Sequence, residues 1–338
     1  MRAMVLHRPA PVETGPLVPE ERALAPLGPH DVRVTVEACG VCRTDLHVVE
    51  GDLPPLVPSV VPGHEIVGRV AEVGPEVRTI AVGERVGVPW LHRTCGRCLY
   101  CLEGRENLCE QKLFTGYSVD GGYASQVLAE EGFLVRLPAG NAAELAPFLC
   151  AGIIGYRALK AALPRPGRRI GFFGFGGSAH LTLQLAARLG YETVAYSRNP
   201  EHLALARRLG AAETVLAGEV RGPGQGPSLD GAVVFAPTGP TVVEALAELR
   251  RGGRLSIAAI HMSPVPPIDY DRLLFGERTI SSVEANTRID AQEFLDLATR
   301  LHLESTVEVR PLAEANRALA DLKAGRVTGA LVLAGTTA

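Results

Sequence analysis

The chain has 338 residues, with 34 Lys and Arg against 37 Asp and Glu, a formal net charge of −3. It is longer than one hydrophobic core usually serves, so two domains are expected. No basic run marks a surface for nucleic acid or for an anionic membrane, which leaves small molecules as the expected partners. A signal-peptide core and a run of about eighteen apolar residues are both missing, which predicts a cytoplasmic protein. The seven cysteines, an odd number in a reducing compartment, favour metal ligands or free thiols over disulfides.

The amino-terminal part has the pattern of short strands. Valines alternate with polar residues over 31–38, which is the period of a half-buried strand. The segments 66–73 and 84–88 are similar, and no long helical period interrupts them. We therefore expect an all-β amino-terminal domain.

The pattern changes after Pro147, where strands and helices begin to alternate. Strands are predicted at 169–173, 193–196, 230–236 and 254–260, and helices at 153–163, 181–189, 199–210 and 241–251. Repeated β-α-β units predict a parallel sheet with helices on both faces. The Gly- and Pro-rich run 218–228 is expected to be a surface loop. Asp290 with Glu293 resembles a capping box for a helix through Arg300, and another helix is predicted over 312–323.

Four cysteines form a C-x2-C-x2-C-x7-C run at Cys95, Cys98, Cys101 and Cys109. Four thiolates on one short loop can surround a tetrahedral metal with no open position, which predicts a structural zinc. Four unrelated free cysteines are the plain alternative. An iron-sulfur cluster is a further one, although the spacing differs from the ferredoxin runs.

A second group of ligand types is spread along the chain. Cys42, His64 and the remote Cys150 are the kinds of residue that hold a catalytic zinc with one open position. Cys39 with Cys42 also reads as a C-x2-C redox pair, but no thioredoxin-like context surrounds it. A buried cysteine with a structural role is the alternative for Cys42 or Cys150 taken alone.

A glycine-rich turn follows the strand at 169–173 and opens a helix. It contains Gly174, Gly176, Gly177, Ser178 and Ala179. Glycines there let the backbone approach a pyrophosphate, whose charge the helix amino terminus stabilises. A simple tight turn is the alternative, but the β-α-β context predicts dinucleotide binding.

The second strand of this unit lacks the acidic end that would bond a ribose 2′-hydroxyl. It ends instead in Ser197 and Arg198. A hydroxyl and a guanidinium suit a 2′-phosphate, so NADP(H) is predicted as the preferred cofactor, with NAD(H) possible if Arg198 is only a solvated surface residue.

Together these motifs resemble the zinc-dependent alcohol dehydrogenases of the medium-chain dehydrogenase/reductase superfamily over essentially the whole chain. The matching runs are 40–47, 62–65, 88–90 with the four-cysteine lobe, 120–124, 150–152 and the glycine-rich turn. The resemblance implies an α/β fold with a GroES-like β-rich catalytic domain at 1–147 and 290–338. It also implies a zinc lobe at 91–112 and a Rossmann-type doubly wound parallel sheet at 148–289.

The resemblance also implies a role for individual residues. Cys42, His64 and Cys150 fall on the catalytic zinc ligands, giving two Zn²⁺ per chain with the four-cysteine site. Glu65 matches a carboxylate that can exchange into the zinc shell, and Asp45 a partner that orients the site. The remaining matches are Thr44 and His47 on a proton relay, Arg43 on the pyrophosphate, and Leu53 and Trp90 on the substrate pocket.

The implied reaction is hydride transfer between an alcohol and NADP(H), or its reverse, reduction of an aldehyde. The apolar pocket favours primary or aromatic alcohols. The alternatives are a polyol or sugar dehydrogenase of the same superfamily and a non-catalytic nucleotide-binding sensor. Two departures are Ile154, where many relatives have a threonine against the nicotinamide, and Ala179 in place of the third glycine. Homodimers and homotetramers are both common in the superfamily, and the sequence does not choose between them.

Overall fold

The computed structural model describes residues 1–162, 168–219 and 229–335, so the loop predicted at 218–228 lies almost wholly outside the described residues. The chain divides into two compact units. Unit 1 comprises Met1–Cys150, Ala285–Leu295 and Ser305–Ala338, and unit 2 comprises Ala151–Glu284 and Asp296–Glu304. The domain boundaries predicted at 147/148 and 289/290 stay a prediction.

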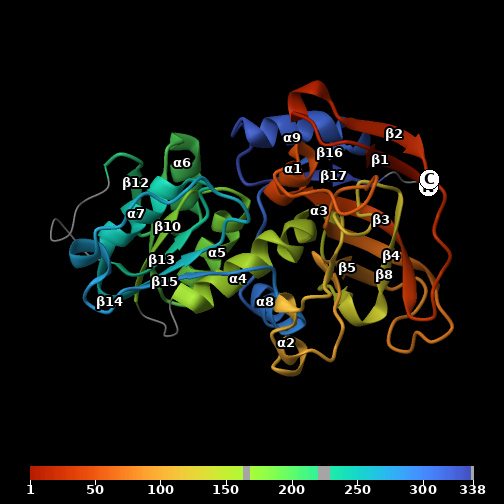
Figure 1. The fold of residues 1–338 in the computed structure, drawn as a ribbon, viewed down its shortest axis with the longest axis horizontal. Helices are drawn as coiled ribbons and strands as arrows, with labels where there is room; N and C mark the ends of the chain where they lie inside the picture. Colours follow the sequence, from red (N-terminus) through yellow and green to blue (C-terminus); the bar gives the residue numbers. More distant parts are fainter. Residues whose placement is uncertain (163–167, 220–228, 336–338) are drawn as a thin grey trace. The chain divides into compact units, whose positions relative to one another are not determined.

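Unit 1 is built on a seven-stranded sheet that joins both ends of the sequence (Figure 1). Its strands, in order across the sheet, are β16 (Val307–Pro311), β17 (Ala330–Ala334), β3 (Asp31–Val41), β4 (Glu65–Val73), β5 (Arg85–Val88) and β9 (Val135–Arg136), with β8 (Gln126–Glu130) also paired to β3. β17 runs antiparallel to β3, so the carboxy-terminal segment completes the amino-terminal sheet. The valines of β3 that were predicted to alternate are buried, which confirms the period-2 pattern.

The prediction of an all-β amino-terminal domain is wrong, because helix α1 (Arg43–Glu50) interrupts it. The helix begins directly after β3 and ends at Gly51, which has a left-handed φ of 85°. Eight residues are too few for a helical period to stand out in the sequence. The smaller elements of unit 1 are β1 (Arg2–Leu6), β2 (Leu17–Glu21), β6 (Leu91–Arg93), β7 (Leu113–Phe114), α2 (Leu99–Leu102), α3 (Ala142–Leu145) and α9 (Ala315–Lys323), with single 3-10 turns at Val12–Thr14, Glu106–Leu108, Glu131–Phe133, Ala146–Leu149 and Leu312–Glu314.

Unit 2 contains a six-stranded sheet in which every neighbouring pair is parallel. The strands are β10 (Arg169–Phe173), β11 (Glu192–Ser197), β12 (Glu213–Leu216), β13 (Leu229–Val234), β14 (Leu249–Ile257) and β15 (Thr279–Ser282). Their order across the sheet, β12-β11-β10-β13-β14-β15, is the doubly wound order of dinucleotide-binding folds. The predicted parallel sheet is confirmed. Its helices are α4 (Ala151–Ala162), α5 (Gly177–Arg188), α6 (Pro200–Arg208) and α7 (Gly239–Glu248), with a π-helical turn at Tyr270–Leu274.

The amino termini of α6 and α8 (Arg288–Arg300) were both predicted from capping residues, and one of the two differs in the structure. The Asn199 side chain accepts a hydrogen bond of 2.9 Å from the backbone N–H of Glu201, and Pro200 is the first residue of α6, as predicted. The predicted capping box at Asp290 is shifted by one turn. Helix α8 begins earlier, and Asp290 accepts from the backbone N–H and the hydroxyl of Thr287. Threonine, not aspartate, therefore occupies the cap, because the chain turns into the helix three residues sooner.

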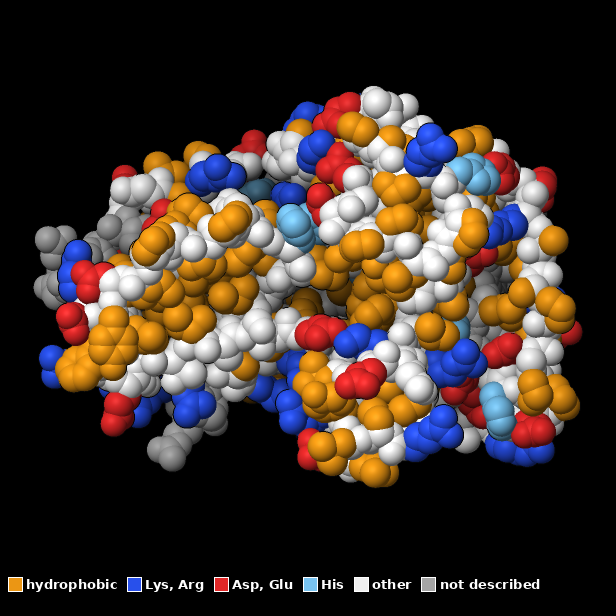
Figure 2. Space-filling model, in the orientation of Figure 1, with side chains coloured by type: hydrophobic (Ala, Val, Ile, Leu, Met, Phe, Trp, Pro, Cys, Tyr) orange, Lys and Arg blue, Asp and Glu red, His pale blue; other side chains and the backbone are white. Residues whose placement is uncertain are grey.

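One helical stretch among the described residues, 142–162, has the length and apolar composition of a membrane span. It combines α3, a 3-10 turn and α4, and 61% of its most apolar window is buried inside the protein. Core helices of soluble proteins pass the same test, so this stretch is weak evidence for a membrane. Figure 2 shows Lys and Arg side chains interspersed with Asp and Glu on the face that it displays.

Candidate active site and metal centres

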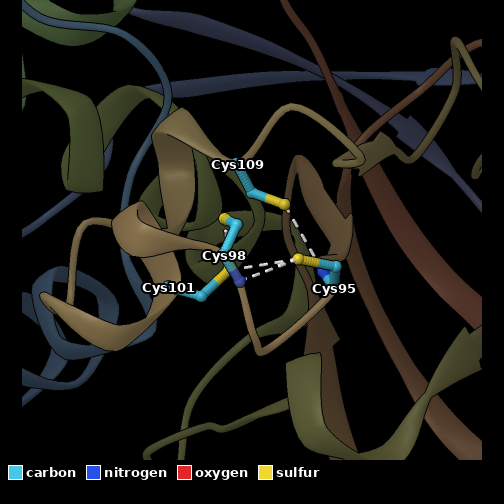
Figure 3. A group of neighbouring side chains, drawn as sticks. All are labelled: Cys95, Cys98, Cys101 and Cys109. Atoms are coloured by element: carbon cyan, nitrogen blue, oxygen red, sulfur yellow. Dashed lines mark hydrogen bonds between the residues drawn. The ribbon is translucent and has the colours of Figure 1, made fainter.

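The four-cysteine run forms a compact lobe in unit 1, between β6 and β7. Figure 3 shows the side chains of Cys95, Cys98, Cys101 and Cys109 turned toward one another. The sulfur of Cys101 lies 3.5 Å from that of Cys98 and 4.0 Å from that of Cys95. A tetrahedral zinc with Zn–S bonds near 2.3 Å requires sulfurs about 3.8 Å apart. The four sulfurs therefore fit a closed tetrahedral metal site.

Backbone N–H groups point toward two of these sulfurs, those of Cys95 and Cys109. The N–H groups of Cys95 and Gln111 each lie 3.4 Å from the sulfur of Cys109, and that of Cys98 lies 3.4 Å from the sulfur of Cys95. Backbone N–H groups of Arg97 and Cys98 lower the pKa of Cys95 to about 6. Thiolates are the form that binds metal, and all seven cysteines are free of disulfides.

The second metal cluster lies wholly within unit 1. Ligand atoms of Cys42, His64, Glu65 and Cys150 all lie within 4.8 Å of one another. Cys42 precedes α1, His64 directly precedes β4, Glu65 is the first residue of β4, and Cys150 follows a 3-10 turn. The structure thus brings together the three predicted ligands and the predicted exchangeable carboxylate. These residues are separated by up to 108 positions in the chain (150 − 42).

Asp45 holds this cluster together from a fully buried position. Its Oδ2 accepts hydrogen bonds from the backbone N–H of Cys42 at 2.9 Å and from the hydroxyl of Tyr123 at 3.1 Å. Its Oδ1 lies 3.1 Å from the backbone N of Gly63 and 2.8 Å from Nδ1 of His64. Four donors compensate the cost of burying the carboxylate.

The histidine geometry shows which nitrogen remains for a metal. Because Nδ1 of His64 donates to Asp45, the neutral form of the ring, which is the form that binds a metal, would present its lone pair at Nε2. That nitrogen is buried and has no hydrogen-bond partner among the described residues. A hydrogen bond with Cys150 lowers the pKa of Cys42 well below its usual range. Burial opposes this shift, and the neighbouring His64 adds to it. An orphaned imidazole nitrogen beside a thiolate fits a zinc ligand set.

Gly63 explains how His64 is presented. Its φ is 100°, a conformation that residues with a Cβ rarely adopt. A Cβ at this position would also lie 2.5 Å from the ring of Tyr123 and 2.8 Å from the sulfur of Cys39. The turn before β4 therefore depends on glycine, and Cys39 is a packing residue here.

The two residues predicted for a proton relay, Thr44 and His47, lie three positions apart on α1 and are both buried. The hydroxyl oxygen of Thr44 is 3.7 Å from the sulfur of Cys42. Nδ1 of His47 is 2.7 Å from a carboxylate oxygen of Asp52, in the loop that follows the helix. Side chains at this spacing share one face of a helix.

Trp90 and Leu53 have different surroundings. The ring of Trp90 meets that of His64 edge-on at 4.8 Å and stacks on Phe114 at 4.6 Å. Leu53 is half-buried and lines a cavity of about 450 Å³ with Tyr117, residues 6–9 at the end of β1, and the 55–60 loop. Trp90 is not among the residues that line this cavity.

The predicted cofactor turn lies in unit 2, between β10 and α5. Gly174 has a φ of 90°, and Gly176 precedes α5 with open space where a Cβ would stand. Ser197 is the buried last residue of β11, and Arg198 beyond it is exposed. The remaining predicted contact, Arg43, is exposed at the first position of α1 in unit 1. Ile154 is half-buried on α4.

Comparison with known proteins gives consistent results. Residues 28–139 match the family "Alcohol dehydrogenase GroES-like domain", and residues 177–300 match "Zinc-binding dehydrogenase". The chain is 49% identical to "Probable alcohol dehydrogenase AdhA" of Mycobacterium tuberculosis, over 98% of this chain and 97% of that protein. It is 39% identical to an alcohol dehydrogenase of Geobacillus stearothermophilus, over 90% and 91%. A cinnamyl alcohol dehydrogenase structure from Sorghum bicolor matches with a TM-score of 0.91 at 27% identity, covering 100% of this chain and 98% of that one.

The chain belongs to the zinc-containing medium-chain alcohol dehydrogenases, with a GroES-like domain and a Rossmann-like parallel sheet. It is an NAD(P)-dependent zinc alcohol dehydrogenase with two zinc sites, the four-cysteine cluster and the cluster of cysteine, histidine and glutamate. The family, the fold class and the enzyme class predicted from the sequence are confirmed.

Two residues of the site, Tyr123 and Asp52, were not predicted from the sequence. Tyr123 belongs to a run that matched the family, but no spacing signal indicated that its hydroxyl reaches Asp45. Burial, and then the charge of Asp45, raise the pKa of Tyr123 well above its usual range, so the hydroxyl remains a donor. Asp52 carries no motif signal at all, since a single acid in a loop is common.

The four-cysteine site predicts the metal content of a single variant. Cys98→Ser should lower zinc from two equivalents per chain to one, because the remaining thiolates no longer close the tetrahedron. Elemental analysis of the purified protein measures this. Cys39→Ala is the matched control, since Cys39 is buried outside both clusters and its loss should leave two equivalents. Two equivalents in Cys98→Ser would contradict the assignment.

The Asp45 network predicts a change in metal affinity. Asp45→Asn keeps the shape of the side chain but removes the charge that orients His64, so zinc at this cluster should bind about 10- to 100-fold more weakly. Competition with a chelator measures the affinity. Asp120→Asn is the control, because Asp120 accepts from the backbone of Val61 without touching either cluster. Equal affinities in the wild type and Asp45→Asn would contradict this role.

Proposed function

We propose that this enzyme interconverts primary or aromatic alcohols and their aldehydes with NADP(H) as the preferred cofactor. The observation that carries the proposal is the buried group of Cys42, His64 and Cys150 around the orphaned Nε2 of His64. A zinc ion held by these three residues would act as a Lewis acid toward the alcohol or carbonyl oxygen. Glu65 lies close enough to serve as a fourth, exchangeable ligand.

The residues of the chain have separable tasks in this proposal. Asp45 fixes the ring orientation of His64 and raises the basicity of its Nε2. The hydroxyl of Thr44, which can both accept and donate, stands beside Cys42 and takes up the proton that leaves the alcohol. His47 then receives that proton, and the carboxylate of Asp52 stabilises the imidazolium that forms.

Unit 2 supports NADP(H) through two residues at the end of β11. Ser197 accepts a hydrogen bond from the backbone N–H of Asn199, which keeps its hydroxyl at the strand end. Arg198 is exposed, and none of the described residues pairs with its guanidinium. Residues 195–199 contain no acid that would favour a ribose 2′-hydroxyl. A 2′-phosphate offers oxygens that match the donors of an arginine fork.

The substrate class is supported by the aromatic surroundings of His64. Trp90, Phe114 and Tyr117 form a stack, with Tyr117 at 6.0 Å from Trp90. Such a wall favours apolar and aromatic side chains over polyols, which require several polar partners. The structural relative from Sorghum bicolor is described as acting on cinnamyl alcohol, an aromatic alcohol, in agreement with this class.

A cytoplasmic homo-oligomer is the proposed state of the enzyme. Large apolar side chains are exposed at Ile260, Val265, Tyr270 and Phe275, shortly before the edge strand β15. Hydrophobic side chains gather on the face of unit 2 that Figure 2 displays. Exposed apolar patches of this kind support contact between copies of the chain, as a homodimer or a homotetramer.

Steady-state assays test the reaction and the substrate class together. Purified protein with zinc should reduce NADP faster with benzyl alcohol than with sorbitol, followed by the absorbance of the reduced nicotinamide. His64→Ala should lower this rate at least about 10³-fold, because Lewis-acid stabilisation supplies several kcal/mol. His30→Ala is the control, since His30 is exposed and pairs with Glu76. No alcohol-dependent signal with either cofactor would exclude the proposal, and faster oxidation of sorbitol would favour the polyol alternative.

A double variant at Ser197 and Arg198 tests the preference for NADP(H) over NAD(H). Replacing Ser197 by Asp and Arg198 by Ala should move the ratio of kcat/KM for NADP over NAD toward NAD by at least about tenfold, because a charged hydrogen bond to phosphate is lost. Arg207→Ala, an exposed arginine at the other end of α6, should leave the ratio unchanged. An unchanged ratio in the double variant would refute the 2′-phosphate assignment.

A further inference from the structure

Gly40 lies directly opposite Glu65 in the pairing of β3 with β4. A Cβ built on Gly40 would lie 1.9 Å from Oε2 of Glu65 and 2.9 Å from both its Cδ and its Cβ. Non-bonded carbon and oxygen atoms stay about 3.5 Å apart at their closest favourable approach. The Glu65 carboxylate therefore occupies the space that a side chain at position 40 would fill.

The need for glycine at this position is spatial and not conformational. Gly40 is absent from the glycines with positive φ, so its backbone is ordinary strand that any residue adopts. It is also paired on its other side with Val332 of β17, which fixes the strand from both edges. Gly63, by contrast, requires both its left-handed φ and its lack of a Cβ.

Because the Glu65 side chain lies against the backbone of Gly40, its carboxylate lies beside the other metal-ligand residues. Its side chain is only 3% exposed, and a carboxylate oxygen lies within 4.8 Å of the ligand atoms of Cys42, His64 and Cys150. A carboxylate that lay away from the bare backbone of Gly40 would leave this group. The three atoms nearest to the Gly40 Cβ position all belong to Glu65, so among the ligand residues Glu65 makes the closest approach to it.

We propose that Gly40 is a positioning residue for Glu65. Its missing side chain directs the carboxylate into the fourth position of the Cys42–His64–Cys150 site, and a methyl group at position 40 would displace it. This inference rests on the metal site of the proposed function. The contact at 1.9 Å involves the far end of a flexible side chain, so the carboxylate can rotate away. The contact of 2.9 Å with the Glu65 Cβ is relieved only by a small shift between the two paired strands.

A double-mutant cycle with Gly40→Ala and Glu65→Ala tests the proposal on the cobalt-substituted enzyme. The visible bands of cobalt(II) report coordination number and geometry without turnover. Both single variants should keep two metals per chain and should change the bands in the same way. Both should also raise the rate of cobalt loss to a chelator by the same factor. The double variant should match Glu65→Ala, because Gly40 then has no carboxylate to direct.

Gly68→Ala is the matched control on the same strand pair. Its Cβ would meet the carbonyl oxygen of Thr35 at 2.3 Å and a methyl group of Val34 at 2.6 Å, and its three nearest atoms belong to these two residues and not to Glu65. It should lower the thermal midpoint of the protein and leave the cobalt bands unchanged. Altered bands in Gly68→Ala like those of Gly40→Ala would overturn the proposal, because general strain in the sheet would then suffice.

The thermal midpoint of the metal-free protein provides a second, independent measurement. If Gly40→Ala lowers the thermal midpoint or prevents folding, Glu65→Ala in the same chain should recover part of the loss, since the contacts with Oε2 and Cδ are gone while the contact of 2.9 Å with the Cβ of residue 65 remains. Unchanged cobalt bands in Gly40→Ala, or additive effects in the double variant, would overturn the inference alone. Full metal content and activity in His64→Ala would instead overturn the proposed function on which it rests.

Discussion

The active site depends on one buried carboxylate. Asp45 lies on the first turn of α1, yet its four donors come from the residue before the helix, from Gly63 and His64 before β4, and from Tyr123 before β8. A charge buried this deeply persists only if its hydrogen bonds are all made, so the arrangement of these segments is coupled. The same bonds that compensate the charge also turn the free nitrogen of His64 toward Cys42 and Cys150. Stability and ligand geometry therefore arise from a single network.

Glycines supply the space around this network. Gly63 allows the turn that presents His64, and the bare backbone of Gly40 receives the carboxylate of Glu65. Protein interiors are packed so closely that one methyl group at either position would move a ligand residue. The strands thus contribute to the metal site by the side chains they lack as well as by those they carry.

The four-cysteine lobe is stabilised differently from the sheet. Its helix α2 buries none of its residues, and Leu99 and Leu102 are 68% and 74% exposed. A segment with so little apolar burial needs another source of stability, and metal binding to four thiolates supplies it. Glu106 adds an attachment by bonding the guanidinium and backbone N–H of Arg288, at the start of α8. The lobe is therefore attached to the Ala285–Leu295 segment of unit 1.

The sequence by itself determined the local features of this protein. The four-cysteine spacing, the alternating strands of unit 2, the cap at Asn199 and the glycine turn all depend on neighbours within about fifteen residues, where periodicity and spacing carry information. Residue type alone indicated that Cys42, His64 and Cys150 could share a metal, and the family resemblance then supported this ligand set, because no local rule relates residues so far apart. Only the tertiary structure decided that Tyr123 reaches Asp45, that Asp52 reaches His47, and that Gly40 faces Glu65. Those contacts depend on strand register and on the path of loops, and a single sequence does not encode either in any short pattern.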